Sequence, residues 1–277
     1  MTLRNATSYV LLTVVGFIFI YPLIWMFFGS FKPNGEIVGS LRLFPSEFQL
    51  EPYKLGWQSG GQFSFADFFT NSFLMTIPTV IFTTLSCILV AYGFARFRFP
   101  LHKVLFALMI STLMMPQTVV IVPRYILFKN LGWLDTYMPF YIPAILGGSA
   151  FYIFMQYQFL RGMSRELDES AMIDGCGSFG ILVRILMPLS MPAMISAAIF
   201  NFMWSWNEFF TVLIYISSVK NYTVSLGLHM MLQLMDSATS WNQIMAMSVL
   251  SMLPGLLFFF LAQRFFVEGI ATTGIKG

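Results

Sequence analysis

A polar segment between two long apolar runs holds the side chains best suited to contact another protein. It covers residues 166–192 and reads ELDESAMIDGCGSFGILVRILMPLSMP. Its acidic start suits the first turn of a short helix, where the backbone dipole favours negative charge. Gly175 suits the position just past the end of that helix, because a positive φ costs glycine little. A helix of about two turns is marginal alone in water, so we expect the segment to dock on a partner. Ala171 is small enough to allow close approach to that partner.

The second half of this segment predicts another short helix over 179–186. Pro188 is expected to open the next long helix, because proline fits the first helical position. The segment is therefore predicted to be a helix–turn–helix outside the lipid. The alternative is an ordinary loop that only connects two membrane spans.

One carboxylate lies inside an apolar run. Trp206, Asn207 and Glu208 fall in the fifth such run, from 189 to about 216. An ionised carboxylate at mid-membrane costs about 2.5–3.5 kcal/mol on insertion scales, so it normally faces protein or a water-filled path. Two interpretations stay open: Glu208 lines a path for a polar solute, or it makes a structural hydrogen bond or lies close to the outer interface.

The sequence offers no catalytic set. It contains no G-x-x-x-x-G-K-[ST] phosphate loop, so it has no recognisable means of holding ATP. His102 and His229 fall on opposite predicted sides of the membrane and are not expected to share a metal. Two cysteines do not make a disulfide framework. We expect a protein that is not an enzyme and holds no cofactor or metal of its own.

Composition indicates a membrane protein that must position these residues within lipid. The chain is 57% hydrophobic and 10% charged, whereas a soluble domain carries roughly 25% charged residues. The net charge of +3 is small and gives no reason to expect a nucleic-acid partner. The predicted fold is all-α, with six transmembrane helices over the apolar stretches 9–29, 71–95, 104–122, the second part of 136–160, 189–216 and 244–262. The first part of 136–160, a stretch that contains Pro139, Pro143 and the pair Gly147-Gly148, is expected to be interfacial or broken, and 124–135 is expected to be a short polar link.

Charge distribution predicts the orientation. Six spans place both termini on one side, and Lys and Arg near the spans prefer the cytoplasm. The side of the termini holds nine basic residues and the other side six. We therefore expect both termini and the polar segment in the cytoplasm. The nine are Arg4, Arg96, Arg98, Lys103, Arg161, Arg165, Arg184, Arg264 and Lys276; the six are Lys32, Arg42, Lys54, Arg124, Lys129 and Lys220.

The polar segment resembles the "EAA" loop of ABC importer permeases. That loop reads Glu-Ala-Ala, three residues, Gly, nine residues, Ile, one residue, Leu-Pro; here Ser170 replaces the first Ala and Met187 the Leu. In the family the loop forms coupling helices that enter a cleft of the ATPase subunit. The resemblance assigns this coupling role to Glu169, Ser170, Ala171, Asp174, Gly175, Ile185 and Pro188.

Further motifs resemble the second, shorter permease of the maltose-type carbohydrate importers. They are residues 71–72 (NS), 91–96 (AYGFAR), 115–116 (MP), 131–136 (LGWLDT) and 268–277 (EGIATTGIKG), and the WNEF element at 206–209 favours the path interpretation for Trp206, Asn207 and Glu208. The resemblance implies a type I importer (MetI-like) fold in a bacterial plasma (inner) membrane. It also implies a homologous second permease, an ATPase dimer that binds ATP and Mg²⁺, an extracytoplasmic solute-binding protein and a carbohydrate solute.

The predicted organisation has three parts: 1–70 with the first span and an external segment, 71–267 with five spans and the coupling loop at about 165–187, and 268–277 as a cytoplasmic tail. A stand-alone secondary transporter or channel is the main alternative. Such proteins usually carry internal repeats and several buried ionisable groups. This chain shows one such carboxylate and no clear repeat. A structural membrane anchor is a third possibility, against which the Pro- and Gly-broken spans argue.

Overall fold

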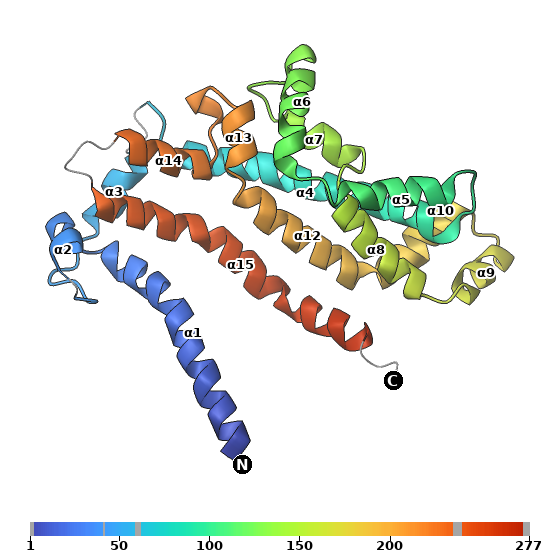
Figure 1. Ribbon diagram of the computed structural model, residues 1–277, viewed down its shortest axis with the longest axis horizontal. Coiled ribbons are helices and arrows are strands. Elements are labelled where there is room, and N and C mark those ends of the chain that lie inside the picture. The colour runs from blue at the N-terminus through green and yellow to red at the C-terminus, as the bar shows by residue number, and fades with distance from the viewer. Residues whose placement is uncertain (1–2, 41, 59–61, 235–239, 274–277) are drawn as a thin grey trace. The chain divides into compact units, whose positions relative to one another are not determined.

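The computed structural model describes residues 3–40, 42–58, 62–234 and 240–273 (Figure 1). Within these residues the structure contains helices and no strand, which confirms the all-α prediction. Residues 274–277 of the predicted tail lie outside the described residues. The helices are α1 Leu3–Gly29, α2 Asn34–Gly39, α3 Glu51–Gln58, α4 Phe65–Arg96, α5 His102–Thr112, α6 Gln117–Asn130, α7 Met138–Ile145, α8 Ala150–Gly162, α9 Glu166–Ile173, α10 Ser178–Ile181, η1 Leu182–Leu186, α11 Met187–Leu189, α12 Met191–Trp206, α13 Phe210–Tyr215, η2 Val219–Asn221, α14 Val224–Leu234 and α15 Trp241–Thr273.

The chain divides into two compact units. Unit 1 comprises residues 1–69 and 224–254, and unit 2 comprises 70–223 and 255–277. The division reflects packing within the chain rather than topology in a membrane. The three-part organisation expected from the sequence therefore stays a prediction.

Unit 1 joins the loops after the first apolar helix to α14 and the first part of α15. The Asn242 side-chain amide donates to the backbone oxygen of Lys32 (3.1 Å), and the buried Lys32 ammonium donates to the backbone oxygen of Arg42. Gly227 lies so close to Phe68 that an added Cβ would come within 2.4 Å of its ring. The apolar window of α1, by contrast, has no buried residue, so this helix is free to contact lipid or a partner subunit.

Unit 2 holds the larger core, which forms where α4, α8 and α12 meet the polar segment. Cys87 and Ile88 of α4 pack with Ile153 of α8 and Ala197 of α12. Ala171, Ile181, Leu182 and Leu186 of the polar segment belong to the same buried cluster. The polar segment is therefore part of the core of unit 2 and not a loop suspended from it.

The candidate spans are less regular than the apolar runs suggest. Among the described residues, four helical stretches are long and apolar enough to cross a membrane, and two bent helix pairs bring the possible total to six. The third run is one of these pairs, because α5 and α6 meet at 103° around Pro116. The expectation of a polar link from 124 to 135 was therefore wrong in part: α6 continues through Pro123 to Asn130.

The predicted break in the fourth run is confirmed at the glycine pair. Gly147 has a φ of +72°, and a Cβ on Gly148 would lie 2.6 Å from the Pro143 carbonyl oxygen. Glycine is therefore the residue that fits both positions in the break between α7 and α8.

Candidate functional site

The first helix of the polar segment ends as its sequence predicts. Helix α9 covers Glu166–Ile173, and its first turn carries three acidic residues. Gly175 follows with a φ of +81°. Its N–H donates to Met172 O (3.0 Å), and the Cys176 N–H donates to Ala171 O (2.9 Å). This pair of bonds is the Schellman termination, which satisfies the last carbonyls of a helix and requires a left-handed residue at the glycine position.

The second leg of the segment differs from the prediction at its end. Helical structure runs from Ser178 to Leu189 and includes a π-helical stretch, Leu182–Leu186. Pro188 lies near the end of this leg and does not open the long helix. Pro192 does so instead, in the first turn of α12. Prolines and π-helical turns are both sites at which helices kink sharply, and the chain bends by 76° between Leu189 and Met191.

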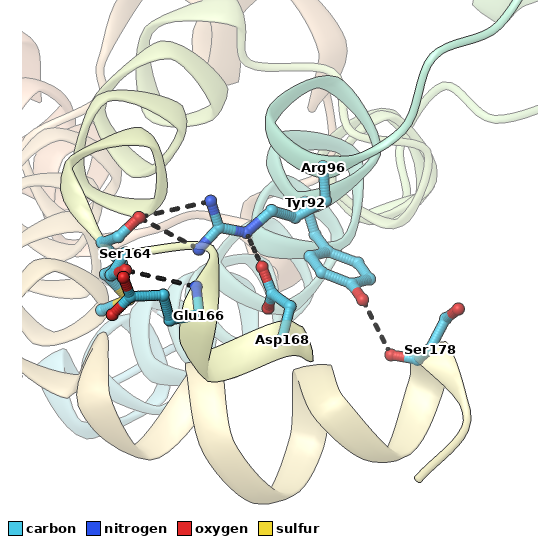
Figure 2. Close-up of polar contacts among 7 residues, drawn as sticks. Tyr92, Arg96, Ser164, Glu166, Asp168 and Ser178 are labelled. Carbon is cyan, nitrogen blue, oxygen red and sulfur yellow. Dashed lines mark hydrogen bonds and ion pairs between the residues drawn. The ribbon is translucent and has the colours of Figure 1, made fainter. Parts of the chain in front are cut away.

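Two contacts fasten this helical hairpin, residues 166–189, to the end of α4 (Figure 2). The Arg96 Nε and the Asp168 Oδ2 form an ion pair at 2.7 Å, and both side chains are nearly buried, at 7% and 12% exposure. The Arg96 guanidinium also reaches the backbone oxygen of Met163 (3.4 Å). The Tyr92 hydroxyl donates to the backbone oxygen of Ser178 (2.9 Å). Each leg of the hairpin is thus tied to α4 by its own polar contact.

The ion pair is tight but incompletely satisfied. The second Asp168 oxygen, Oδ1, is buried and has no hydrogen-bond partner among the described residues. A nearly buried charge of this kind depends on its single counter-charge. Arg96 is the counter-charge of Asp168 among the described residues.

The hairpin has a buried face and an exposed face. Ala171 is buried against unit 2, so the smallness predicted to allow approach to another protein instead allows packing within this chain. Ile185 is half-buried against the same core, while Glu169, Ser170, Asp174, Gly175 and Pro188 are exposed. The most exposed large apolar side chains of the hairpin are those of Met172, Ile173 and Phe179, the last two 87% and 71% exposed. We call these three residues the exposed hairpin patch.

The fifth apolar run is interrupted where its carboxylate lies. Helix α12 ends at Trp206, and α13 begins at Phe210. Trp206 is buried and stacks on Phe202 with ring centroids 5.6 Å apart, while the exposed Asn207 caps the end of α12 by donating to Met203 O (2.7 Å). The Glu208 Oε1 accepts the backbone N–H of Thr211 (3.0 Å). Glu208 therefore has a structural role as a cap of α13.

Glu208 also lines a hollow in unit 2. This hollow has a volume of about 330 Å³, and Gln117, Arg124 and Ser205 are among its walls. A second hollow of about 550 Å³ shares Gln117 and Trp204 with it and adds Thr83, Ser149, Phe151, Tyr152, Phe200 and Asn201. The side-chain nitrogen of Asn201 is buried and unpaired among the described residues. Of the three predicted path residues, only Glu208 lines these hollows.

The motif at 131–136 joins two loops of unit 2 through hydrogen bonds to Asp135. Asp135 has a φ of +60°, and its carboxylate accepts the backbone N–H groups of Ser217 (3.1 Å) and Ser218 (2.8 Å). Burial opposes ionisation of Asp135, but the hydrogen bonds from Ser218 and Ser217 outweigh it and lower the pKa of this carboxyl. The Asn71 amide reaches the other end of the same loop, at Lys220 O and Tyr222 O. The motifs at 71–72 and 131–136 therefore both hydrogen-bond to the loop 217–222.

The amino-acid sequence matches a known protein family and several of its members. The family described as "Binding-protein-dependent transport system inner membrane component" matches residues 68–272. A probable ABC transporter permease protein, YurM of Bacillus subtilis (strain 168), is 32% identical over 93% of this chain and 84% of its own. The arabinooligosaccharides transport system permease protein AraQ of the same organism is 30% identical over 95% of this chain and 93% of its own.

The fold has a solved counterpart. The crystal structure of a bacterial ABC transporter involved in the import of the acidic polysaccharide alginate includes a chain that superposes with a TM-score of 0.84 at 18% identity, covering 95% of this chain and 96% of that one. The fold and the family match together confirm the resemblance drawn from the polar segment. This chain belongs to the family of binding-protein-dependent transport system inner membrane components, the multi-pass permease subunits of ABC importers.

Proposed function

We propose that this chain forms half of the translocation path of an ATP-driven carbohydrate importer and couples to a separate ATPase through the hairpin 166–189. The observation that carries the proposal is the division of the hairpin into two faces. One face is locked to α4 by the Arg96–Asp168 ion pair. The other presents the exposed hairpin patch, flanked by the exposed Glu169 and Asp174.

The ATPase is the proposed occupant of the exposed hairpin patch. Large apolar side chains gathered on a segment outside the lipid indicate a protein contact. A rigid hairpin can transmit a push from that contact because α4 holds both of its legs. In this proposal ATP and Mg²⁺ bind to the ATPase dimer. A homologous second permease supplies the other half of the path, and an extracytoplasmic solute-binding protein delivers the solute.

The two hollows of unit 2 are the proposed path surface. Their walls combine amide and hydroxyl groups with aromatic rings, notably Gln117, Asn201 and Trp204. A few polar groups among aromatic side chains are the usual lining of a small-molecule site, and sugars offer both hydroxyls and apolar ring faces. The names of relatives agree with such a solute: AraQ transports arabinooligosaccharides, and NgcG of Streptomyces coelicolor serves diacetylchitobiose uptake. UgpE of Brucella melitensis, named for sn-glycerol-3-phosphate, gives the alternative solute class.

Retention of an ATPase and its effect on uptake test both function and orientation. We expect the chain, expressed with its complex in the inner membrane, to co-purify with an ATPase on the cytoplasmic side. Uptake of labelled oligosaccharide should fall to background when ATP hydrolysis is blocked. A stand-alone secondary transporter would retain uptake under the same conditions. A chain with the hairpin and termini outside could not retain a cytoplasmic ATPase at all.

Glu208→Gln tests the path role separately from the capping role. The glutamine oxygen can still accept the Thr211 N–H, so we expect complex assembly and basal ATPase activity to remain. Uptake should fall about fivefold, since a hydrogen bond to a charged group is stronger than a neutral one by about 1 kcal/mol. Glu47→Gln, at an exposed position outside both hollows, is the matched control. Wild-type uptake in Glu208→Gln would remove this residue from the path.

A further inference from the structure

A third hollow in unit 2 is larger than the two assigned to the path and shares no residue with them. It has a volume of about 880 Å³. It lies between the end of α4, the link 97–101, the start of α5 and the end of α8. Its walls carry the basic side chains of Arg98, Lys103, Arg161 and Arg165, and the described residues that line it include no Asp or Glu. We call it the basic hollow.

The positive charge of the basic hollow is not balanced by the residues that the structure describes. Arg96, which also lines it, is committed to Asp168. The other four cations are exposed and form no ion pair with any side chain that the structure describes. Like charges gathered on one concave surface concentrate the local potential and attract an anion.

The start of α5 adds backbone donors to the same place. This helix has 11 residues, carries no acidic residue in its first turn, and lacks a side-chain cap on its first N–H groups. Its N-cap, Leu101, and its first residues His102, Lys103 and Val104 all line the basic hollow. The His102 N–H donates to Phe99 O (3.2 Å), which leaves those of Lys103 and Val104 without a partner among the described residues. Free N–H groups at the positive end of a helix are a ready site for phosphate. Side chains and backbone therefore specify the same kind of ligand.

The basic hollow lies where three candidate spans begin or end, which is where lipid headgroups are expected. One candidate span, α4, ends at Arg96, a second ends at Gly162, and the bent pair of the third run begins at His102. Large apolar side chains border the cations, including Phe97, Leu101 and Val104, each at least 43% exposed. A free phosphate ion would use only the basic part of this surface. A phospholipid would use both parts, with its phosphate on the cations and its acyl chains along the apolar side chains.

We propose that the basic hollow binds an anionic phospholipid, in the leaflet on the side of the coupling hairpin. Basic pockets between membrane helices are suited to such headgroups. The site is next to the anchor of the hairpin, because Arg96 and Arg165 line both the basic hollow and the smaller hollow beside Asp168. A lipid bound here would neutralise the cations that surround the anchor without displacing the ion pair.

Lipid binding to the full-length chain, purified with the partners that it retains, tests this inference. The protein is titrated with phosphatidylglycerol or phosphatidylcholine, and bound lipid is counted by native mass spectrometry. We expect phosphatidylglycerol to bind preferentially. The pair Lys103→Gln and Arg161→Gln should weaken its binding about twenty-fivefold, since each basic residue near an anionic surface contributes about fivefold. Phosphatidylcholine binding should not change.

The matched control removes the same charge elsewhere. Lys129→Gln with Arg184→Gln, both exposed and outside the basic hollow, should change phosphatidylglycerol binding less than twofold. A second pair within the hollow, Arg98→Gln with Arg165→Gln, should reproduce the loss and guards against a folding defect in the first pair.

Three results would overturn the proposal. Equal losses in the hollow pairs and in the control pair would mean that net charge, not a site, attracts the lipid. Full displacement of phosphatidylglycerol by millimolar inorganic phosphate would make the hollow a soluble-anion site. Unchanged lipid binding in both hollow pairs together with loss of the ATPase would make it a protein-docking surface.

Discussion

Arg96→Leu is expected to release the hairpin 166–189 from α4 and reduce uptake to background. The substitution leaves Asp168 nearly buried with neither of its oxygens paired among the described residues. Removing one partner of a buried ion pair costs about 3–5 kcal/mol, which is comparable to a large part of the stability of a small structural unit. The measurements are oligosaccharide uptake, ATPase retention and the reactivity of Cys176 towards a thiol reagent in a Cys87→Ser background. Cys176 packs partly against the core, so release of the hairpin should raise its reactivity.

Lys129 provides the control. Lys129 is exposed, lies outside the basic hollow and forms no ion pair with the described residues, so Lys129→Leu should leave uptake and Cys176 reactivity close to wild type. Arg96→Leu combined with Asp168→Leu should recover part of the loss, because well-packed apolar residues often replace a buried ion pair without net cost. If Arg96→Leu alone retained full uptake, the ion pair would not hold the hairpin during transport.

Gly175→Leu is expected to leave the protein in the membrane while the ATPase dissociates. A residue with a Cβ at a φ of +81° is strained by about 1–2 kcal/mol, which alone weakens a docked conformation about five- to thirtyfold. A Cβ at this position meets no atom of the chain within 4 Å. The added leucine side chain would therefore project from the exposed side of the hairpin, where it would meet the proposed ATPase surface.

A graded series at Gly175 separates backbone strain from side-chain bulk. Asn tolerates a positive φ better than other side chains, so Gly175→Asn should bind the ATPase better than Gly175→Ala, and Gly175→Leu worst. Ser178→Leu, across the turn, should be milder because Gly175 carries the positive φ and Ser178 does not. The measurements are ATPase co-purification and the ratio of ATP hydrolysed to solute taken up. Wild-type values in Gly175→Leu would reduce the hairpin to an ordinary connection.

Local patterns in the sequence predicted the local structure well. The acidic first turn and Gly175 placed α9 and its termination correctly, because a helix end depends on a few adjacent residues. The glycine pair at 147–148 predicted the break between α7 and α8 for the same reason. Prolines were less decisive, because a proline can start, kink or lie near the end of a helix. Pro188 was assigned to the start of a helix that Pro192 opens.

Contacts between distant residues could not be read from one sequence. Arg96 ends one apolar run and Asp168 belongs to the polar segment, and nothing in either residue type selects the other. The burial of Ala171 was missed for the same reason, since a small residue fits equally well against a partner or against its own chain. The structural cap made by Glu208 depends on the break after Trp206, which an uninterrupted apolar run does not indicate.

The bend at Ser190 sets the direction in which the hairpin can move the long helix that follows. The axes of the segment 178–189 and of α12 differ by 76°. Of any shift along the first axis, only about one quarter, the cosine of 76°, projects onto the axis of α12. The component perpendicular to that axis, given by the sine of 76°, is nearly the whole of the shift. ATPase closure transmitted through this elbow would therefore tilt α12, with Asn201 and Trp204 on it, far more than it would slide the helix through the membrane.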